Sequence, residues 1–128
     1  MATVLLVEED EPLAERISQL LRAAGHEVWH AVDSLAALKI VDMPERRLDV
    51  LVTPVRMPPQ RPHGFALARM ARLRRPGLAV IYLAASDAPE PASEIAVGPI
   101  LTTPIEAEAL VSAIEEALQQ RSANGGDC

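Results

Sequence analysis

Cysteine is almost missing from this chain of 128 residues, whose single thiol belongs to Cys128 near the end of the sequence. One cysteine cannot form a disulfide within the chain, and it cannot supply the cysteine pairs of a structural zinc site. The three histidines are scattered without the spacing of metal ligands. We therefore expect a protein of the reducing cytoplasm that holds no metal through these residues.

Aromatic residues and long apolar runs are missing too. Aromatics make up 2% of the sequence, so the core of the predicted domain must be aliphatic. No apolar run reaches the ~20 residues that a transmembrane helix needs. Met1 leads directly into an apolar segment, without the basic and apolar regions of a signal peptide. These features predict a chain that neither spans a membrane nor is secreted.

The charge is unevenly distributed. A formal net charge of -6 argues against general binding to nucleic acid or to anionic membranes. Five acids nevertheless fall between Glu8 and Glu15, and eight arginines fall between Arg46 and Arg75. The arginines could bind an acidic partner or phosphate, but arginines on the water-facing side of a helix usually serve to keep the protein solvated. The sequence leaves both interpretations open.

Short apolar runs alternate with segments of helical period along the whole chain. The runs predict strands over five ranges: Thr3–Val7, Glu27–Ala31, Val50–Val52, Ala79–Ala84 and Ile100–Leu101. The other segments predict helices over 11–24, 34–41, 65–73, about 91–97 and 106–120. Such alternation predicts a parallel sheet with helices on both faces. The residues 1–121 would form one domain, and the polar, Gly-containing residues 122–128 a disordered tail.

Capping residues and helical faces follow from the same pattern. Asp10 and Ser34 are placed to cap the first two helices, and Gly25 to end the first. The apolar period puts these residues on the buried faces of those two helices: Leu13, Ile17, Leu20, Leu21, Ala24, Leu35, Leu38 and Val41.

In an open parallel sheet, ligands bind at the carboxyl ends of the strands, so the residues that follow the strands decide the function. Here these are Glu8, Glu9, Asp10, Thr53, Pro54, Ala84, Ala85, Thr102 and Thr103. Pro54 directly follows the third apolar run, where a nucleophile or metal ligand would be aimed into the crevice. Because proline has no ionisable group and no backbone N–H, Pro54 performs no chemistry.

Four segments carry a resemblance to a known family: VLLVEEDEPL at 4–13, DVLVTPVRMP at 49–58, VIYLAAS at 80–86 and TTP at 102–104. In this order they closely resemble the receiver domain of bacterial two-component response regulators. The resemblance implies a doubly wound (βα)5, flavodoxin-like α/β fold, a three-layer sandwich with strand order 2-1-3-4-5.

The resemblance also implies site residues. In that family two acids and an Asp hold Mg²⁺, the Asp accepts the phosphoryl group, and a hydroxyl and a Lys contact that group. These positions fall here on Glu8, Glu9, Pro54, Ala84 and Thr103. Forming an acyl phosphate needs a carboxylate, a divalent ion and a cation, and this chain lacks the first and third at those positions. The site is therefore expected to be degenerate and to need no cofactor.

The function that follows is that of a stand-alone pseudo-receiver in two-component or phosphorelay signalling. It would not be an enzyme, and it would act through phosphorylation-independent contact with a protein, such as a histidine kinase or another regulator, or with a second copy. The expected contact face combines the helix near 91–97, the strand 100–101 and the helix 106–120, and it includes Glu94, Ile100, Glu106 and Leu110. No effector domain is expected after Gln120.

Three alternatives stay open. Glu8 and Glu9 are weak candidates for residual Mg²⁺ binding. Asp49, or less plausibly Thr53, could serve as a non-standard phosphoacceptor, although Asp49 precedes its strand and Thr53 should point away from Pro54's side. The vacated pocket could also hold a small ligand.

Overall fold

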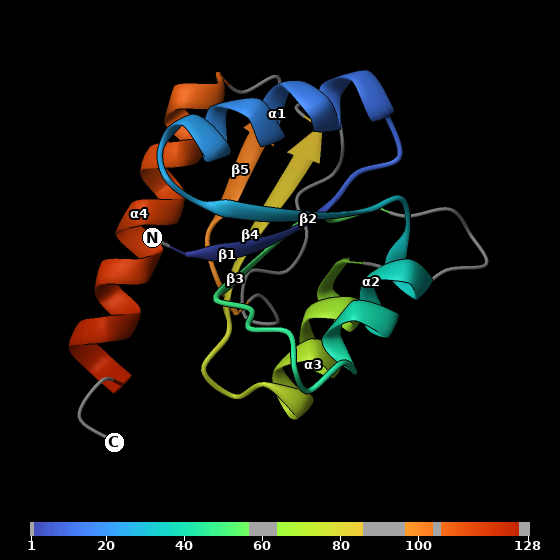
Figure 1. Ribbon diagram of the computed structural model, residues 1–128, viewed down its shortest axis with the longest axis vertical. Helices are drawn as coiled ribbons and strands as arrows, with labels where there is room; N and C mark the ends of the chain where they lie inside the picture. Colours follow the sequence, from blue (N-terminus) through green and yellow to red (C-terminus); the bar gives the residue numbers. More distant parts are fainter. Residues whose placement is uncertain (1, 57–63, 86–96, 104–105, 126–128) are drawn as a thin grey trace.

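The chain forms a three-layer sandwich in a computed structural model (Figure 1), which describes residues 2–56, 64–85, 97–103 and 106–125. Five parallel strands form one sheet in the order β2-β1-β3-β4-β5. The strands are β1 (Thr3–Val7), β2 (Glu27–Ala31), β3 (Val50–Pro54), β4 (Ala79–Ala85) and β5 (Ile100–Thr103). This confirms the predicted fold class and strand order.

The last three strands are longer at their carboxyl ends than their apolar runs predicted. Pairing between β3 and β4 continues to Pro54 and Leu83, and pairing between β4 and β5 continues to Ala85 and Thr103. Backbone pairing does not require apolar side chains, so the ladder continues into the residues of the candidate site. Pro54, Ala84 and Thr103 therefore lie on the sheet itself, whereas Glu8 and Glu9 follow the end of β1.

Four helices cover the sheet in the described part of the chain: α1 (Glu11–Ala23), α2 (Ser34–Val41), α3 (Gly64–Arg74) and α4 (Ala107–Gly125). The helix predicted near 91–97 falls almost wholly outside the described residues. The last helix continues to Gly125, four residues into the stretch predicted to be disordered. No described helix is both long and apolar enough to cross a membrane.

Two apolar clusters fill the space between the layers. On one face, α1 and α4 pack on the sheet through Ile17, Leu21, Leu110 and Ile114. On the other face, α2 and α3 pack through a second cluster that includes Val41 and Leu67 (Figure 1). All five residues of β1 are buried, as expected of a central strand covered on both faces.

The predicted caps are half right. The carboxylate of Asp10 caps α1 by accepting from the backbone N–H of Leu13 at 3.1 Å, as predicted. Asp33, not Ser34, caps α2, because its carboxylate accepts from the N–H of Ala36 at 2.9 Å. Gly25 follows α1 with φ of 95°, a conformation that glycine adopts without strain.

The predicted helical faces are right in part. Three of the predicted positions are buried: Ile17, Leu21 and Val41. Leu38 is half-buried against the core. The prediction was wrong for four positions, which are exposed: Leu13, Leu20, Ala24 and Leu35. Four smaller residues that the apolar period did not indicate complete the buried faces: Ala14, Ser18, Ser34 and Ala37.

Candidate functional site

The carboxyl ends of β1, β3, β4 and β5 meet at one edge of the sheet, as parallel strands require (Figure 1). Leu6 pairs with Val52, and Pro54 pairs with Leu83. These pairings bring the residues after β1 to the same edge as Pro54. The structure therefore assembles the predicted site positions in one place.

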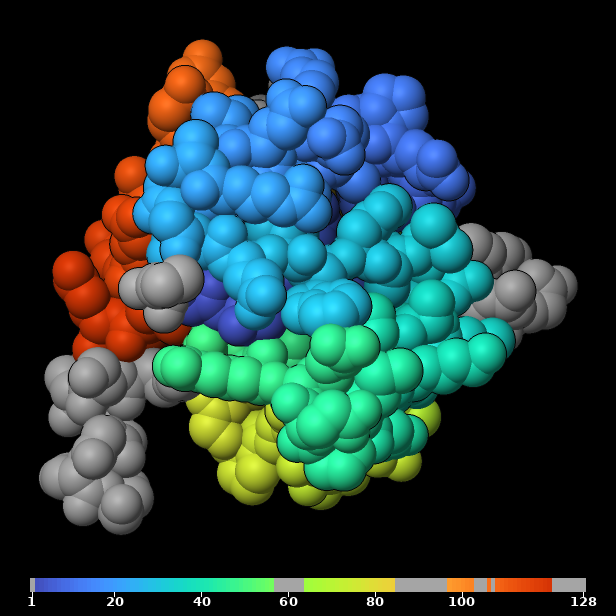
Figure 2. Space-filling view, viewed as in Figure 1, coloured from blue at the N-terminus to red at the C-terminus, as the bar shows by residue number. Residues whose placement is uncertain are grey.

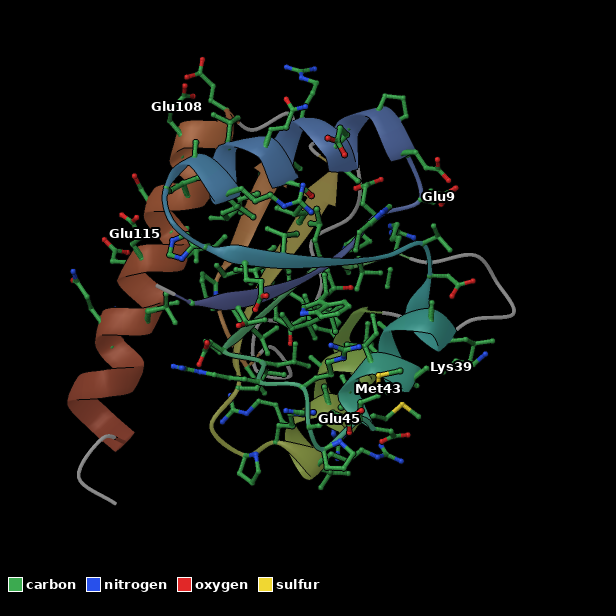
Figure 3. The ribbon with its side chains drawn as sticks, viewed as in Figure 1. Glu9, Lys39, Met43, Glu45, Glu108 and Glu115 are labelled. Carbon is green, nitrogen blue, oxygen red and sulfur yellow. The ribbon has the colours of Figure 1, made fainter. Side chains whose placement is uncertain are left out.

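The acids after β1 are engaged locally. The carboxylate of Glu8 accepts from the N–H of Asp10 at 3.1 Å, and Asp10 caps α1. The carbonyl of Glu8 accepts from Nε2 of His30 at 2.7 Å. Glu9 is exposed at the start of α1 (Figure 3). Among the described residues, no group of three or more His, Cys, Asp or Glu side chains is arranged to hold a metal ion.

Pro54 is accommodated where the ladder to β1 has ended. Pairing of β3 with β1 stops at Val52, while pairing with β4 continues to Pro54 and the N–H of Val55 donates to Leu83 at 2.9 Å. A proline inside a central strand costs one hydrogen bond between strands, because proline has no backbone N–H. Pro54 avoids this cost because β1 no longer pairs with β3 at this position. The sheet thus tolerates a residue that brings no carboxylate to the edge.

Thr53, one of the weaker candidates for a phosphoacceptor, is fully buried. Its hydroxyl donates to the carbonyl of Pro54 at 3.1 Å. A hydroxyl that is buried and hydrogen-bonded to the backbone carbonyl of the next residue is not presented to a phosphate donor.

Gly64 is pressed against the end of β3. Its N–H donates to the carbonyl of Val55 at 2.8 Å, and a Cβ at this position would overlap the carbonyl oxygen of Pro54. Only glycine allows so close an approach. The start of α3 is therefore fixed directly on the strand that carries Pro54.

The positions expected to meet a phosphoryl group lie on the neighbouring strands. Ala84 pairs with Thr102, and Ala85 pairs with Thr103. Ala84 offers a methyl group where a hydroxyl would be needed, and Thr103 is a β5 residue whose side chain is outside the described set. Together with Pro54, these positions supply the edge with no nucleophilic carboxylate and no Lys.

Asp49, the main alternative acceptor, lies at the opposite edge of the sheet. It immediately precedes β3, and its carboxylate accepts from the N–H of Thr3 at 2.9 Å. Nε of Arg47 lies 3.3 Å from the same carboxylate. The Asp49 side chain is only 4% exposed, so the structure uses this acid to fasten β1 to β3.

A sequence profile of the response regulator receiver domain matches residues 4–115. The chain belongs to the response regulator receiver family. It is 35% identical over 88 residues to the probable transcriptional regulatory protein TcrX of Mycobacterium tuberculosis. The aligned residues make up 69% of this chain and 36% of that protein. It is 34% identical over 116 residues to the response regulator protein FleR of Pseudomonas aeruginosa. Here the aligned residues make up 88% of this chain and 24% of that protein. The chain thus spans only about a quarter to a third of the length of these curated relatives.

Solved structures agree on the fold. A receiver domain protein from Clostridium thermocellum has a TM-score of 0.80 at 25% identity, covering 96% of this chain and 98% of that one. A CheY-like receiver domain protein from Methanospirillum hungatei has a TM-score of 0.80 at 20% identity, covering 98% of this chain and 99% of that one, a likeness of fold alone.

The predicted contact face of this receiver is described only in part. Glu94 lies outside the described residues. Glu106 is exposed and Ile100 is half-buried against the core, so both are accessible to some degree. The prediction was wrong for Leu110, which is 0% exposed and packs with Ile114 beneath α4.

Tyr82 is the residue whose role the sequence did not reveal. Its ring is fully buried and meets Phe65 edge-on, with centroids 4.8 Å apart. Its hydroxyl accepts from the N–H of Val97 at 3.2 Å, and its own N–H donates to Pro99 at 2.9 Å. Burial raises the pKa of this phenol, an effect that the hydrogen bond and nearby Arg72 partly oppose. Tyr82 therefore fastens the entry of β5 to β4, and a buried tyrosine in need of a partner was the available signal.

The arginine-rich stretch is largely engaged within the domain. Arg75 donates to the carbonyls of Val41, Arg46 and Met43, the first at 3.1 Å. The guanidinium of Arg74 lies 2.5 Å from the carboxylate of Asp42. The guanidinium of Arg46 stacks on Trp29 at 4.1 Å from the ring centroid. Arg74 and Arg75 thus hold the end of α3 to the end of α2, and Arg46 packs on β2. Neither interpretation of the sequence included these roles.

Proposed function

We propose that this receiver is a pseudo-receiver, which signals by binding other proteins and is not itself phosphorylated. The observation that carries the proposal is Pro54 at the carboxyl end of β3. A proline cannot attack a phosphoryl donor, and it cannot coordinate the Mg²⁺ that would gather the phosphoryl oxygens. The chain would then serve as a binding module and not as an enzyme.

The neighbouring positions support the same proposal independently. A phosphorylated receiver needs a group that responds to the phosphate, and Ala84 has no hydroxyl to do so. The carboxylate of Glu8 accepts a local hydrogen bond from the backbone N–H of Asp10. Residual Mg²⁺ binding would have to rely on Glu8 and Glu9 without a third carboxylate from β3, which is a poor ligand set for this ion.

The alternative, phosphotransfer through Asp49, has less support. Asp49 is buried, paired with Arg47 and located at the amino end of β3. An acceptor there would be a full strand length from the acids after β1. A small-ligand function of the vacated edge has no specific observation in its favour.

The proposal places the chain in two-component signalling, as a partner of a histidine kinase or of another regulator. The curated relatives are named as regulators, and they are several times longer than the matched region. Contact through the surface around β5 and the start of α4 is part of the proposal, with exposed Glu106 as its best-described residue.

The test is incubation with acetyl phosphate and Mg²⁺, followed by intact-mass measurement. We expect the mass to stay unchanged, while a receiver that carries the acceptor Asp gains one phosphoryl group in the same mixture. A stable adduct that hydroxylamine removes would overturn the proposal. If such an adduct formed, the same experiment on Asp49→Asn would show whether Asp49 carries it. An adduct that is missing from this variant, shown by thermal denaturation to be folded, would be assigned to Asp49.

A further inference from the structure

The exposed apolar side chains of this receiver are concentrated on one helical layer. Among the described residues eight large apolar side chains are exposed, and five of them lie on or beside α2 and α3: Val32, Leu35, Met43, Met70 and Leu73. Leu73 is 81% exposed and Leu35 is 46% exposed. Groups of large apolar side chains that a folded domain leaves in water mark surfaces that a partner covers.

Two rows of exposed residues form this surface, one for each helix. The first row is spaced four residues apart along α2 and just past its end, and consists of Leu35, Lys39 and Met43. The second row follows one side of α3 and consists of Arg69, Met70 and Leu73. Residues three and four apart on a helix point to the same side, so each row is continuous. We call these six residues the α2–α3 surface.

The two rows are held side by side at the ends of their helices. The guanidinium of Arg74 lies 2.5 Å from the carboxylate of Asp42, which directly precedes Met43. The guanidinium of Arg75 donates to the carbonyl of Met43 at 2.6 Å. Both arginines come immediately after Leu73. Figure 2 shows α2 and the residues after it at the lower right of the molecule, above the end of α3. The surface is therefore already ordered before a partner binds, which lowers the entropy cost of binding.

The two helices that carry this surface contain positive charge only. There is one Lys and no acid in α2, and there are three Arg and no acid in α3. Two acids follow α2: Asp42 is paired with Arg74, and Glu45 lies beyond the end of the helix (Figure 3). Lys39 and Arg69 are exposed and make no ion pair with any residue that the structure describes. The surface thus presents unneutralised cations beside apolar groups.

We propose that the α2–α3 surface binds an acidic amphipathic helix of a partner protein. Apolar side chains on one side of such a helix would cover Leu35, Met70 and Leu73, which water now surrounds. Its carboxylates would pair with Lys39 and Arg69, and a guanidinium can bind a carboxylate through two parallel hydrogen bonds. A helix suits this surface because the side-chain rows of two packed helices accept the side chains of a third.

Charge favours this occupant over two others. Two copies of the α2–α3 surface would repel each other, because both present cations. An anionic membrane would meet the field of the whole molecule, whose net charge is -6, whereas a helical segment contacts this surface alone. The inference does not depend on whether the chain is phosphorylated, and it adds a second contact face to the one proposed around β5.

Fluorescence anisotropy of a labelled synthetic peptide tests the proposal on the whole chain. The peptide is a helix of about 18 residues with Leu along one side and Glu on the other sides. One control peptide has Lys in place of every Glu, and a second has the same composition in scrambled order. We expect the Glu peptide to bind at least about tenfold more tightly than either control. A Glu peptide that does not bind, or that binds no more tightly than a control, overturns the proposal.

Two matched variants show where the peptide binds. Leu73→Asp places an acid at the centre of the exposed apolar groups and should weaken binding of the Glu peptide at least about tenfold. Leu13→Asp is the control, because Leu13 is also an exposed leucine but belongs to α1, which covers the opposite face of the sheet. It should leave the affinity unchanged. If the two variants have equal affinities, the peptide binds elsewhere and the proposal fails.

Exchanging the charge of the surface tests the choice of an acidic partner. The double variant Lys39→Glu with Arg69→Glu keeps the apolar side chains and replaces both free cations by acids. It should bind the Lys peptide more tightly than the Glu peptide, and thermal denaturation will show that it is folded. A double variant that still prefers the Glu peptide contradicts the proposal.

Two further measurements test the other occupants. Sedimentation velocity of the chain alone should give no association that Leu73→Asp abolishes, and vesicles of phosphatidylglycerol should not bind the chain through this surface. Association that Leu73→Asp abolishes would assign the α2–α3 surface to a second copy and overturn the proposal. Vesicle binding that Leu73→Asp abolishes would assign it to a membrane, with the same consequence.

Discussion

Two glycines show how single residues allow close contacts with the sheet. A Cβ at Gly64 would overlap the carbonyl of Pro54, and a Cβ at Gly98 would overlap the carbonyl of Val80. Both neighbours are backbone atoms of the sheet and cannot rotate away. Gly64 lies beside the candidate site at the start of α3, whereas Gly98 lies at the opposite end of the sheet, before β5 begins.

Gly64→Ala and Gly98→Ala should therefore each lower the free energy of unfolding by about 1–3 kcal/mol, the usual cost of overpacking. Urea denaturation followed by circular dichroism measures this. Gly77→Ala is the matched control, because no atom lies within 4 Å of its added Cβ. Equal effects at all three glycines would contradict the close approach.

Tyr82 supplies a second prediction at the residue scale. It is the only tyrosine in the sequence, so the absorbance of the phenolate reports on it alone. Burial raises the pKa of this phenol above its ordinary value of about 10 in the folded state. Absorbance at the phenolate band should rise at higher pH in the folded protein than in urea.

The sign of the linked stability follows from the same shift. Below pH about 10 the phenol is protonated in both states, and its neutral form stabilises the fold. Between that pH and the raised pKa of the folded state, the unfolded chain alone loses the proton, so stability falls as pH rises. In Tyr82→Phe this part of the decline should disappear. An alkaline titration that is identical in folded and unfolded protein would contradict the burial of the hydroxyl.

At the scale of elements, α2 depends on its capping residue. The carboxylate of Asp33 accepts from the N–H of Ala36, while the hydroxyl of Ser34 is buried and has no hydrogen-bond partner among the residues that the structure describes. Asp33→Ala should lower the free energy of unfolding by about 0.5–2 kcal/mol. Ser34→Ala should be neutral or slightly stabilising, because it removes an unsatisfied buried hydroxyl. Thermal denaturation of both variants checks the assignment, and the reverse order of effects would restore Ser34 as the cap.

The contact between α2 and α3 depends on Arg75. Its planar guanidinium donates to carbonyls at and beyond the end of α2, where the carbonyls of a helix lack partners within the helix. Arg75→Ala should lower the free energy of unfolding by about 1.5–3 kcal/mol. Arg75→Lys should lower the free energy of unfolding by less than Arg75→Ala but should not restore the original value, because an ammonium group cannot donate to several carbonyls in the planar geometry of a guanidinium. Arg69→Ala, on the exposed side of the same helix, is the control and should change the value by less than about 0.5 kcal/mol.

At the scale of the whole molecule, a binding ion would stabilise the native fold by mass action. The acids after β1 hold local hydrogen bonds, and β3 contributes no carboxylate to them. Adding MgCl2 should therefore leave the thermal midpoint where NaCl of equal ionic strength leaves it. If the thermal midpoint rose with Mg²⁺ concentration, and this rise were smaller in Glu8→Gln, the acids after β1 would form a functional metal site.

Much of the fold could be predicted because the relevant signals are local. The runs Thr3–Val7 and Val50–Val52 are apolar because both faces of a central parallel strand are covered, and Asp10 stands beside the helix it caps. The helical faces were harder, since Leu13 and Leu35 are exposed although their spacing suits a buried face. Which part of a helix meets the sheet depends on the distance between layers, and the chain does not encode that distance locally.

The sequence by itself determined what the site cannot do, because the absence of a carboxylate at Pro54 is a matter of covalent chemistry that no fold can alter. Only the tertiary structure decided where the remaining groups act. Arg75 reaches the end of α2 across 34 residues, Asp49 fastens β1 to β3, and Tyr82 holds Val97. Each of these contacts joins distant parts of the chain, so each depends on strand order and register, which arise when the whole sheet assembles.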